Sequence, residues 1–184
     1  MNILSIICRP REFRRKIEES RHQLYRVAYS WCHDTALADD LVQETLFKAL
    51  KSSAQLRDDK LLKAWLFSIL ANCWRDHLRQ YRAMDNIDDF EDCLSLDEAT
   101  PEDERALAQM VTNVRAEIAR LPLIQREVLT LVDLEELSYA EVGEILSIPV
   151  GTVMSRLCRA RRALKERLQP LEMGHGQPKI RSIK

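Results

Sequence analysis

Residues 138–164 read SYAEVGEILSIPVGTVMSRLCRARRAL, and this stretch decides the fold. Ser138 and Glu141 stand three residues apart, in the pattern of a capping box that opens a helix. We expect that helix to be short, because the Ser-Ile-Pro that follows it breaks the chain. A second helix is predicted over residues 150–168, and it should stop at Pro170. A short capped helix, a tight break and a longer helix form the helix-turn-helix arrangement.

The second of these helices has two different faces. At about 100° per residue, one stripe is apolar and predicts a core face: Val153, Leu157, Ala160, Leu164 and Leu168. Another stripe, about 140° away, is basic and carries hydroxyls: Thr152, Ser155, Arg156, Arg159 and Arg162. Such a helix suits the major groove of B-DNA, where arginine donates to guanine and hydroxyls hold phosphates. The plainer alternative is a solvated basic face, but the capping box and the break favour DNA.

A helix predicted over residues 61–82 repeats this division. Its apolar face contains Phe67, Leu70, Trp74, Leu78 and Tyr81. Its polar stripe contains Asn72, Arg75, Arg79 and Arg82. Asparagine can bond a base edge and arginines can follow phosphates, so this stripe predicts a second contact with a duplex or an opened strand. An ordinary exposed face is the alternative.

A helix predicted over residues 35–51, with Asp34 as its N-cap, differs in charge. One face of it is acidic and includes an aromatic: Asp40, Gln43, Glu44 and Phe47. An acidic stripe repels DNA but suits a protein partner. A metal site is the alternative, and it is disfavoured because no histidine stands at ligand spacing on this face. We therefore expect neither a metal nor a cofactor.

The remaining chain also reads as helical, and the predicted fold class is all-α. Only four glycines occur, and beta-branched clusters and hairpin turns are nearly absent. Single helices are expected over residues 13–33 and 123–133. A further helix should open at a capping box over residues 100–103, with Pro101 at its first position, and end near Arg120.

Charge is segregated along the chain, although the formal net charge is only −1. Residues 1–84 have a net charge of +5 and residues 105–184 have +4, whereas residues 85–104 carry ten acids and no base. Like charges at this density repel and predict an extended acidic linker. It is either a solvated loop or a shield that keeps the basic parts away from nonspecific anions. We expect two small helical domains, 1–84 and 105–172, joined by this linker and followed by a disordered tail at 173–184.

Several classes of protein are disfavoured. No apolar run approaches the roughly 20 residues that span a bilayer, so we expect no membrane insertion. The apolar opening precedes the basic residues, which is the wrong order for a secretory signal, and we expect a cytoplasmic protein. The five cysteines are scattered without a Cys-x-x-Cys pair, so they predict neither a zinc site nor a disulfide framework. No catalytic motif supports a hydrolase or nuclease, and no catalytic residue is expected.

Three stretches together resemble the extracytoplasmic-function (ECF) sigma factors of bacteria. DDLVQETLFKAL is similar to their region 2.2, and KAWLFSILANCWRDHLRQYR is similar to regions 2.3 and 2.4. LPLIQREVLTLVDLEELSYAEVGEILSIPVGTVMSRLCRARRALKERL is similar to region 4. The resemblance runs from about residue 24 to residue 168, with the linker in the expected place. It implies a region 2 bundle and a region 4 helix-turn-helix.

The resemblance also implies roles for the three faces. The acidic face would dock on the clamp helices of the largest subunit of core RNA polymerase. Asn72, Arg75, Arg79 and Arg82, with the loop around Arg57, would engage the opened minus-ten element of promoter DNA. The basic stripe that begins at Thr152 would read the minus-thirty-five element. The linker would thread through polymerase channels, and factors of this family are commonly held inactive by an anti-sigma factor.

The sequence departs from the family pattern at four positions. Leu46-Phe47 reverses the usual order, so the aromatic should face outward. Leu70 stands where a small residue is usual. Gly143 and Ser147 replace a helix alanine and a turn glycine, and we expect them to loosen the helix-turn-helix by about 1 kcal/mol. The main alternative to a sigma factor is a helix-turn-helix regulator that binds DNA without polymerase.

Overall fold

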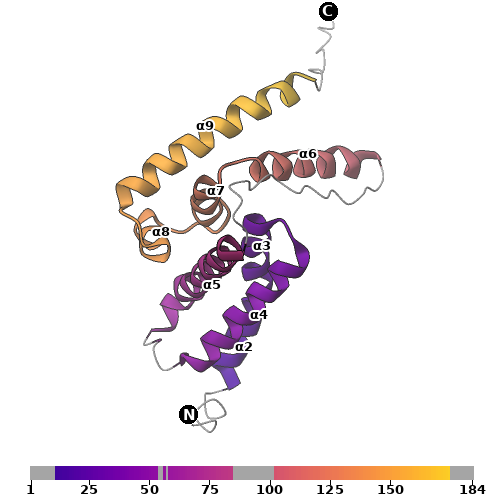
Figure 1. Ribbon diagram of the computed structural model, residues 1–184. Coiled ribbons are helices and arrows are strands. Elements are labelled where there is room, and N and C mark those ends of the chain that lie inside the picture. Colours follow the sequence, from indigo (N-terminus) through magenta and orange to yellow (C-terminus); the bar gives the residue numbers. More distant parts are fainter. Residues whose placement is uncertain (1–10, 54–55, 57, 85–101, 175–184) are drawn as a thin grey trace, which may run out of the picture.

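The computed structural model describes residues 11–53, 56, 58–84 and 102–174. Throughout this part of the chain the regular structure is helical, and it contains no strand, so the all-α class is confirmed. The helices form two modules that lie against each other (Figure 1). No helix among the described residues is long and apolar enough to cross a membrane.

In the described residues, the N-terminal module is a helical bundle that contains α2 (Arg11–Glu19), α3 (Arg21–Cys32), α4 (Thr35–Lys51) and α5 (Leu62–Met84). A short 3₁₀ turn, Asp59–Leu61, leads into α5. The core of the bundle is formed where α3, α4 and α5 pack together. Large apolar side chains fill it almost without exposure: Leu24, Val27, Trp31, Val42, Leu66, Phe67 and Leu70.

The single helix predicted over residues 13–33 is wrong, because the chain divides at Ser20. The Ser20 hydroxyl donates to the carbonyl of Lys16 at 2.9 Å, and its backbone N–H is shared between Lys16 and Ile17. A serine that bonds back to the preceding turn competes with the regular helix ladder and bends it. The helix start predicted at Asp34 is confirmed, since its carboxylate accepts from the N–H of Leu37 at 2.9 Å.

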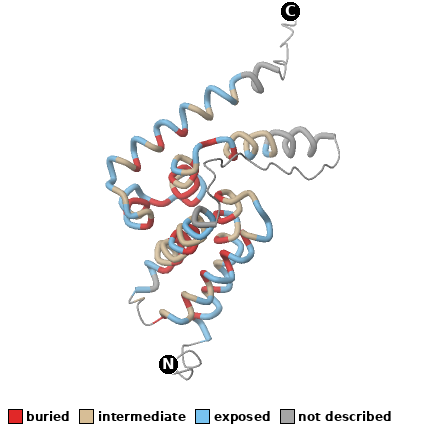
Figure 2. The backbone as a smooth tube through the Cα atoms, viewed as in Figure 1, coloured by how far each residue is buried: buried red, intermediate tan, exposed pale blue. Residues whose placement is uncertain are grey.

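The C-terminal module contains α6 (Glu102–Ala119), α7 (Leu123–Leu129), the π-helical turn η3 (Thr130–Leu134), α8 (Tyr139–Leu146) and α9 (Val150–Gly174). Its core lies between α7, α8 and α9. It includes Val128, Leu131, Val142, Ile145, Val153, Leu157 and Ala160. The first three residues of the apolar stripe predicted for the last helix are therefore buried in a core, and Leu164 is partly buried against it. Leu168, the last residue of the stripe, is only half-buried. Buried residues run along the facing sides of the helices in Figure 2.

Two helix ends in this module differ from the prediction. The helix expected over residues 123–133 ends at Leu129 and widens into η3. Helix α9 continues past Pro170 to Gly174, where we expected it to stop. A proline inside a helix removes one backbone hydrogen bond and kinks the helix, and a long helix can continue beyond it. The capping box predicted at 100–103 includes Thr100 and Pro101, which lie outside the described residues, as does most of the acidic linker.

Candidate nucleic-acid and protein interfaces

The helix-turn-helix begins as the sequence predicts. The Ser138 hydroxyl accepts from the N–H of Glu141, and the Glu141 carboxylate accepts from the backbone N–H of Ser138 at 2.8 Å. The hydrogen bond from the Ser138 hydroxyl holds the pKa of Glu141 below its usual value. Helix α8 then ends at Leu146, and its C-cap residue, Ser147, has a left-handed φ of 55°. This is the conformation that glycine adopts at least cost, and it explains why a glycine is usual here.

Close packing explains why a glycine stands at position 143, which the sequence did not reveal. A Cβ at this position would lie 3.0 Å from the carbonyl oxygen of Ile148, closer than side chains normally allow. The N–H of Ile148 donates to the carbonyl of Gly143 at 2.9 Å, so the chain crosses close to α8 directly after the turn. The expectation that Gly143 loosens the motif therefore ignores the close approach that it permits.

Helix α9 presents most of its predicted basic stripe to solvent. Ser155, Arg159 and Arg162 are exposed, whereas Thr152 and Arg156 are half-buried. Arg159 is held along the helix, because its guanidinium donates to the carbonyl of Ser155 at 3.2 Å. These side chains share one surface of α9, and a duplex could meet them together.

Arg161 of α9 belongs to a different contact. Its Nε donates to a carboxylate oxygen of Asp133 at 3.1 Å, and this ion pair ties α9 to the turn η3. Arg161 therefore supports the module and does not extend the exposed basic stripe.

Helix α5 places its polar stripe opposite its core face. Asn72 and Arg79 are exposed, and Arg75 is half-buried with its guanidinium 2.7 Å from the side-chain oxygen of Asn72. Arg79 also forms an ion pair with Asp76 at 3.4 Å. The sequence prediction of a basic stripe did not include this acidic residue. Arg57 and the side chain of Arg82 lie outside the described residues.

Three residues of the predicted apolar face of α5 are buried, namely Phe67, Leu70 and Trp74. Leu78 is partly buried against the core. Tyr81, which we assigned to the same face, is half exposed, and this assignment is wrong. The position lies in the last turn of α5, where the helix runs beyond the core of the bundle.

Helix α4 carries the acidic face as predicted. Asp40, Gln43, Glu44 and Phe47 are all exposed, and 63% of Phe47 is accessible to solvent. The inverted Leu-Phe order therefore does turn the aromatic outward. Lys48 lies 2.8 Å from the Glu44 carboxylate and partly offsets its charge. The described residues contain no group of three acids, histidines or cysteines that could hold a metal ion.

Glu127 of α7 lies between the two modules and was missed from the sequence. Burial raises the pKa of its carboxyl to about 7, although Arg156, the indole of Trp74 and Arg75 act in the opposite direction. These neighbours belong to α9 and α5, so one carboxyl is close to an arginine from each predicted DNA-binding helix. Its apolar neighbours Leu123 and Val128 gave no signal that this position faces a second module.

Comparisons with known proteins match both modules. The family model described as Sigma-70 region 2 matches residues 17–84, and the model described as Sigma-70, region 4 matches residues 112–164. The RNA polymerase sigma-H factor of Pseudomonas aeruginosa is 32% identical over 160 residues, which are 82% of this chain and 83% of that protein. The ECF RNA polymerase sigma-E factor of Haemophilus influenzae is 36% identical over 141 residues, 72% of this chain and 75% of that protein.

Solved structures share the arrangement of helices. The sigma factor RpoE from Bartonella quintana, in complex with the anti-sigma factor NepR, has a TM-score of 0.72 and 27% identity, covering 87% of this chain and 98% of that one. CnrH, in complex with the cytosolic domain of CnrY, has a TM-score of 0.64 over 91% of this chain and 94% of that one. At 24% identity, the second comparison shows the fold.

Proposed function

This chain belongs to the ECF group of RNA polymerase sigma factors, and from its surfaces we propose how it directs polymerase to promoters. The proposal divides the work between the acidic face of α4, the polar stripe of α5 and the basic stripe of α9. One observation carries it: each of these faces lies on a helix whose opposite side is buried, and each exposes side chains to solvent, although Arg75, Thr152 and Arg156 are half-buried. The fold thus holds each face in place, and the exposed side chains of each face remain available to partners.

Helix α4 would dock on core polymerase. Asp40, Gln43 and Glu44 supply carboxylates and an amide, and Phe47 adds a large exposed apolar surface beside them. Aromatic side chains with a charged rim are typical of the energetic centre of a protein interface. The partner that we propose is the pair of clamp helices in the largest polymerase subunit.

The other two faces would bind promoter DNA. Ser155, Arg159 and Arg162 of α9 would enter the major groove of the minus-thirty-five element, flanked by Thr152 and Arg156. Asn72, Arg75 and Arg79 of α5 would contact the opened minus-ten element, with Arg57 and Arg82 beside them. Each module alone should bind DNA weakly, because a few exposed cations supply only a small electrostatic term. Linkage on one polymerase raises the effective concentration of the second contact.

We further propose that the protein has no catalytic site of its own, acts in the cytoplasm and is held inactive by an anti-sigma factor. The last point has a parallel in RpoE of Bartonella quintana, whose structure contains an anti-sigma factor. The acidic residues between 85 and 104 would shield the basic faces until polymerase is bound.

A promoter-binding assay with and without core polymerase tests this function against the main alternative. We expect the free protein to bind a promoter fragment weakly and without sequence preference, and the holoenzyme to bind it specifically. A regulator that acts without polymerase would bind the same fragment tightly alone. Tight, sequence-specific binding by the free protein would therefore contradict the proposal.

A further inference from the structure

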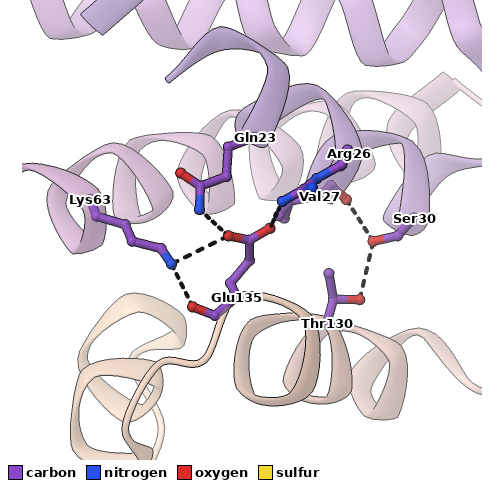
Figure 3. A network of polar contacts seen from close by, with 7 residues as sticks. All are labelled: Gln23, Arg26, Val27, Ser30, Lys63, Thr130 and Glu135. Atoms are coloured by element: carbon purple, nitrogen blue, oxygen red, sulfur yellow. Dashed lines mark hydrogen bonds and ion pairs between the residues drawn. The ribbon is translucent and has the colours of Figure 1, made fainter. Parts of the chain in front are cut away.

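A buried carboxylate joins the two modules. Glu135 follows η3 in the C-terminal module, and its side chain is only 1% exposed (Figure 3). Its partners all come from the N-terminal module. One carboxylate oxygen accepts from Arg26 at 3.1 Å, and the other accepts from Gln23 and lies 3.4 Å from the ammonium of Lys63. Lys63 also donates to the backbone carbonyl of Glu135.

The backbone is irregular on both sides of Glu135, and it directs this side chain toward the N-terminal module. The preceding turn η3 is π-helical, a wide turn that inserts extra chain and is common at functional positions. The next residue, Glu136, has a φ of 56°, in the left-handed region that costs a non-glycine residue about 1 kcal/mol or more. Both irregularities flank Glu135, whose carboxylate reaches into the other module.

Two further hydrogen bonds cross the same boundary. The hydroxyls of Ser30 and Thr130 lie 3.1 Å apart (Figure 3). Arg75, from the polar stripe of α5, donates to the carbonyl of Ile145 in α8 at 3.4 Å. Helix α5 packs against α8 along this side, so part of the surface assigned to the minus-ten element is covered by the helix-turn-helix.

The contact is strong only while the modules touch. A buried carboxylate without a partner is costly, whereas the same group with two cations and an amide is satisfied. Separation returns Glu135, Arg26 and Lys63 to water, which solvates each of them. A contact of this kind opens when a partner binds the separated modules more tightly than the modules bind each other.

We propose that the Glu135 contact is an autoinhibitory latch that holds the free protein closed, with Arg75 withheld from DNA. The effect on promoter binding rests on the function proposed above. Elements named minus ten and minus thirty-five are about 25 base pairs apart, or about 85 Å of B-DNA at 3.4 Å per pair. Modules that touch each other cannot occupy both. The α4 face stays exposed in the closed state, so polymerase can dock first and the latch opens afterwards.

A disulfide placed across the boundary tests the closed state directly. The hydroxyls of Ser30 and Thr130 are close enough for cysteine sulfurs at these positions to form a bond of about 2 Å after a small adjustment. We expect S30C/T130C to crosslink within the full-length chain on mild oxidation, while each single variant controls for the native cysteines. Failure of the double variant to crosslink, with both thiols accessible to a thiol reagent, would overturn the closed state.

The crosslinked protein then tests inhibition. With core polymerase and a promoter, oxidised S30C/T130C should lose at least nine-tenths of its transcription (about tenfold, or about 1.4 kcal/mol), and a reductant should restore it. Full activity of the crosslinked form would refute the autoinhibitory role. Wild-type protein that never initiates with core polymerase would instead count against the proposed function, and the crosslinking rate would still report on the latch.

The role of Glu135 itself is measured by the crosslinking rate of S30C/T130C in two further backgrounds. E135Q should slow crosslinking at least about tenfold, because the buried charge that attracts Arg26 and Lys63 is gone. D133N is the matched control, since Asp133 pairs with Arg161 inside the C-terminal module and should change the rate less than about twofold. If E135Q impairs folding, R26M/K63M removes the partners from the other side and should give the same slowing. An unchanged rate in a folded variant of either kind would overturn the role of Glu135.

Discussion

Glu127 makes the stability of the protein depend on pH in a defined direction. Its carboxyl has a pKa of about 7, against an ordinary value of 4.5, with burial as the largest cause. Because the folded pKa is raised, the stabilising contribution is fully present below pH 4.5 and is lost as pH rises through about 7. The shift corresponds to about 3 kcal/mol over the whole range, and about 1 kcal/mol of it falls between pH 6 and pH 8. Arg156, Trp74, Arg75 and Arg126 are the neighbours that oppose the shift.

Glu127→Gln isolates this effect, because glutamine keeps the shape of the carboxyl and cannot ionise. Urea unfolding of both proteins, followed by circular dichroism, gives the free energy of unfolding near pH 6 and pH 8. We expect the variant to be more stable than wild type at pH 8, with an advantage smaller by about 1 kcal/mol at pH 6. All other residues are the same in the two proteins, so their contributions cancel in the comparison. An identical difference at the two pH values would show that Glu127 is ionised throughout, and the reasoning from burial would fail.

Three further substitutions test individual surfaces. Ser147→Gly should stabilise the protein by up to about 1 kcal/mol in thermal unfolding, because the left-handed φ of 55° suits glycine. The control Ser52→Gly, at a helix end with a φ of −97°, should not stabilise it. Equal stability changes in the two variants would contradict backbone strain at Ser147. Arg159→Ala should lower transcription from a minus-thirty-five-dependent promoter about tenfold, while Arg161→Ala should leave it nearly unchanged; the reverse order would refute the assignment of the stripe. Glu44→Lys should weaken co-purification with core polymerase because it reverses a charge on the α4 face, and retention equal to that of a Glu12→Lys control would remove α4 from the docking surface.

Local signals in the sequence predicted the elements that depend on local chemistry. The cap at Asp34 and the capping box at Ser138 are confirmed, because each needs only a side chain and a backbone N–H a few residues away. The core stripe of α9 followed from its 3.6-residue period. The sequence analysis missed two helix irregularities: the break at Ser20, whose hydroxyl bonds to the carbonyl of Lys16, and the wide π-helical turn η3. Neither of them changes the spacing of the apolar residues.

The relation between the modules could not be predicted in this way. Glu135 and Glu127 look like ordinary surface acids, and only the packing of the second module shows that Glu135 is buried against Arg26 and Lys63. The same holds for Gly143, because the lack of a side chain there matters only through the close approach of the Ile148 carbonyl, five residues away. These contacts join separate elements, and no periodicity within one helix encodes them.

Run-off transcription with purified core polymerase and a library of genomic fragments tests the central claim most directly. We expect this protein to confer transcription on a small set of fragments that share two sequence elements, and to confer none without core polymerase. Sequencing the start sites would place those elements about 10 and 35 bases upstream, at the spacing that two separated modules must span. Reconstituted enzyme that initiates on no fragment, or on all of them equally, would contradict the account.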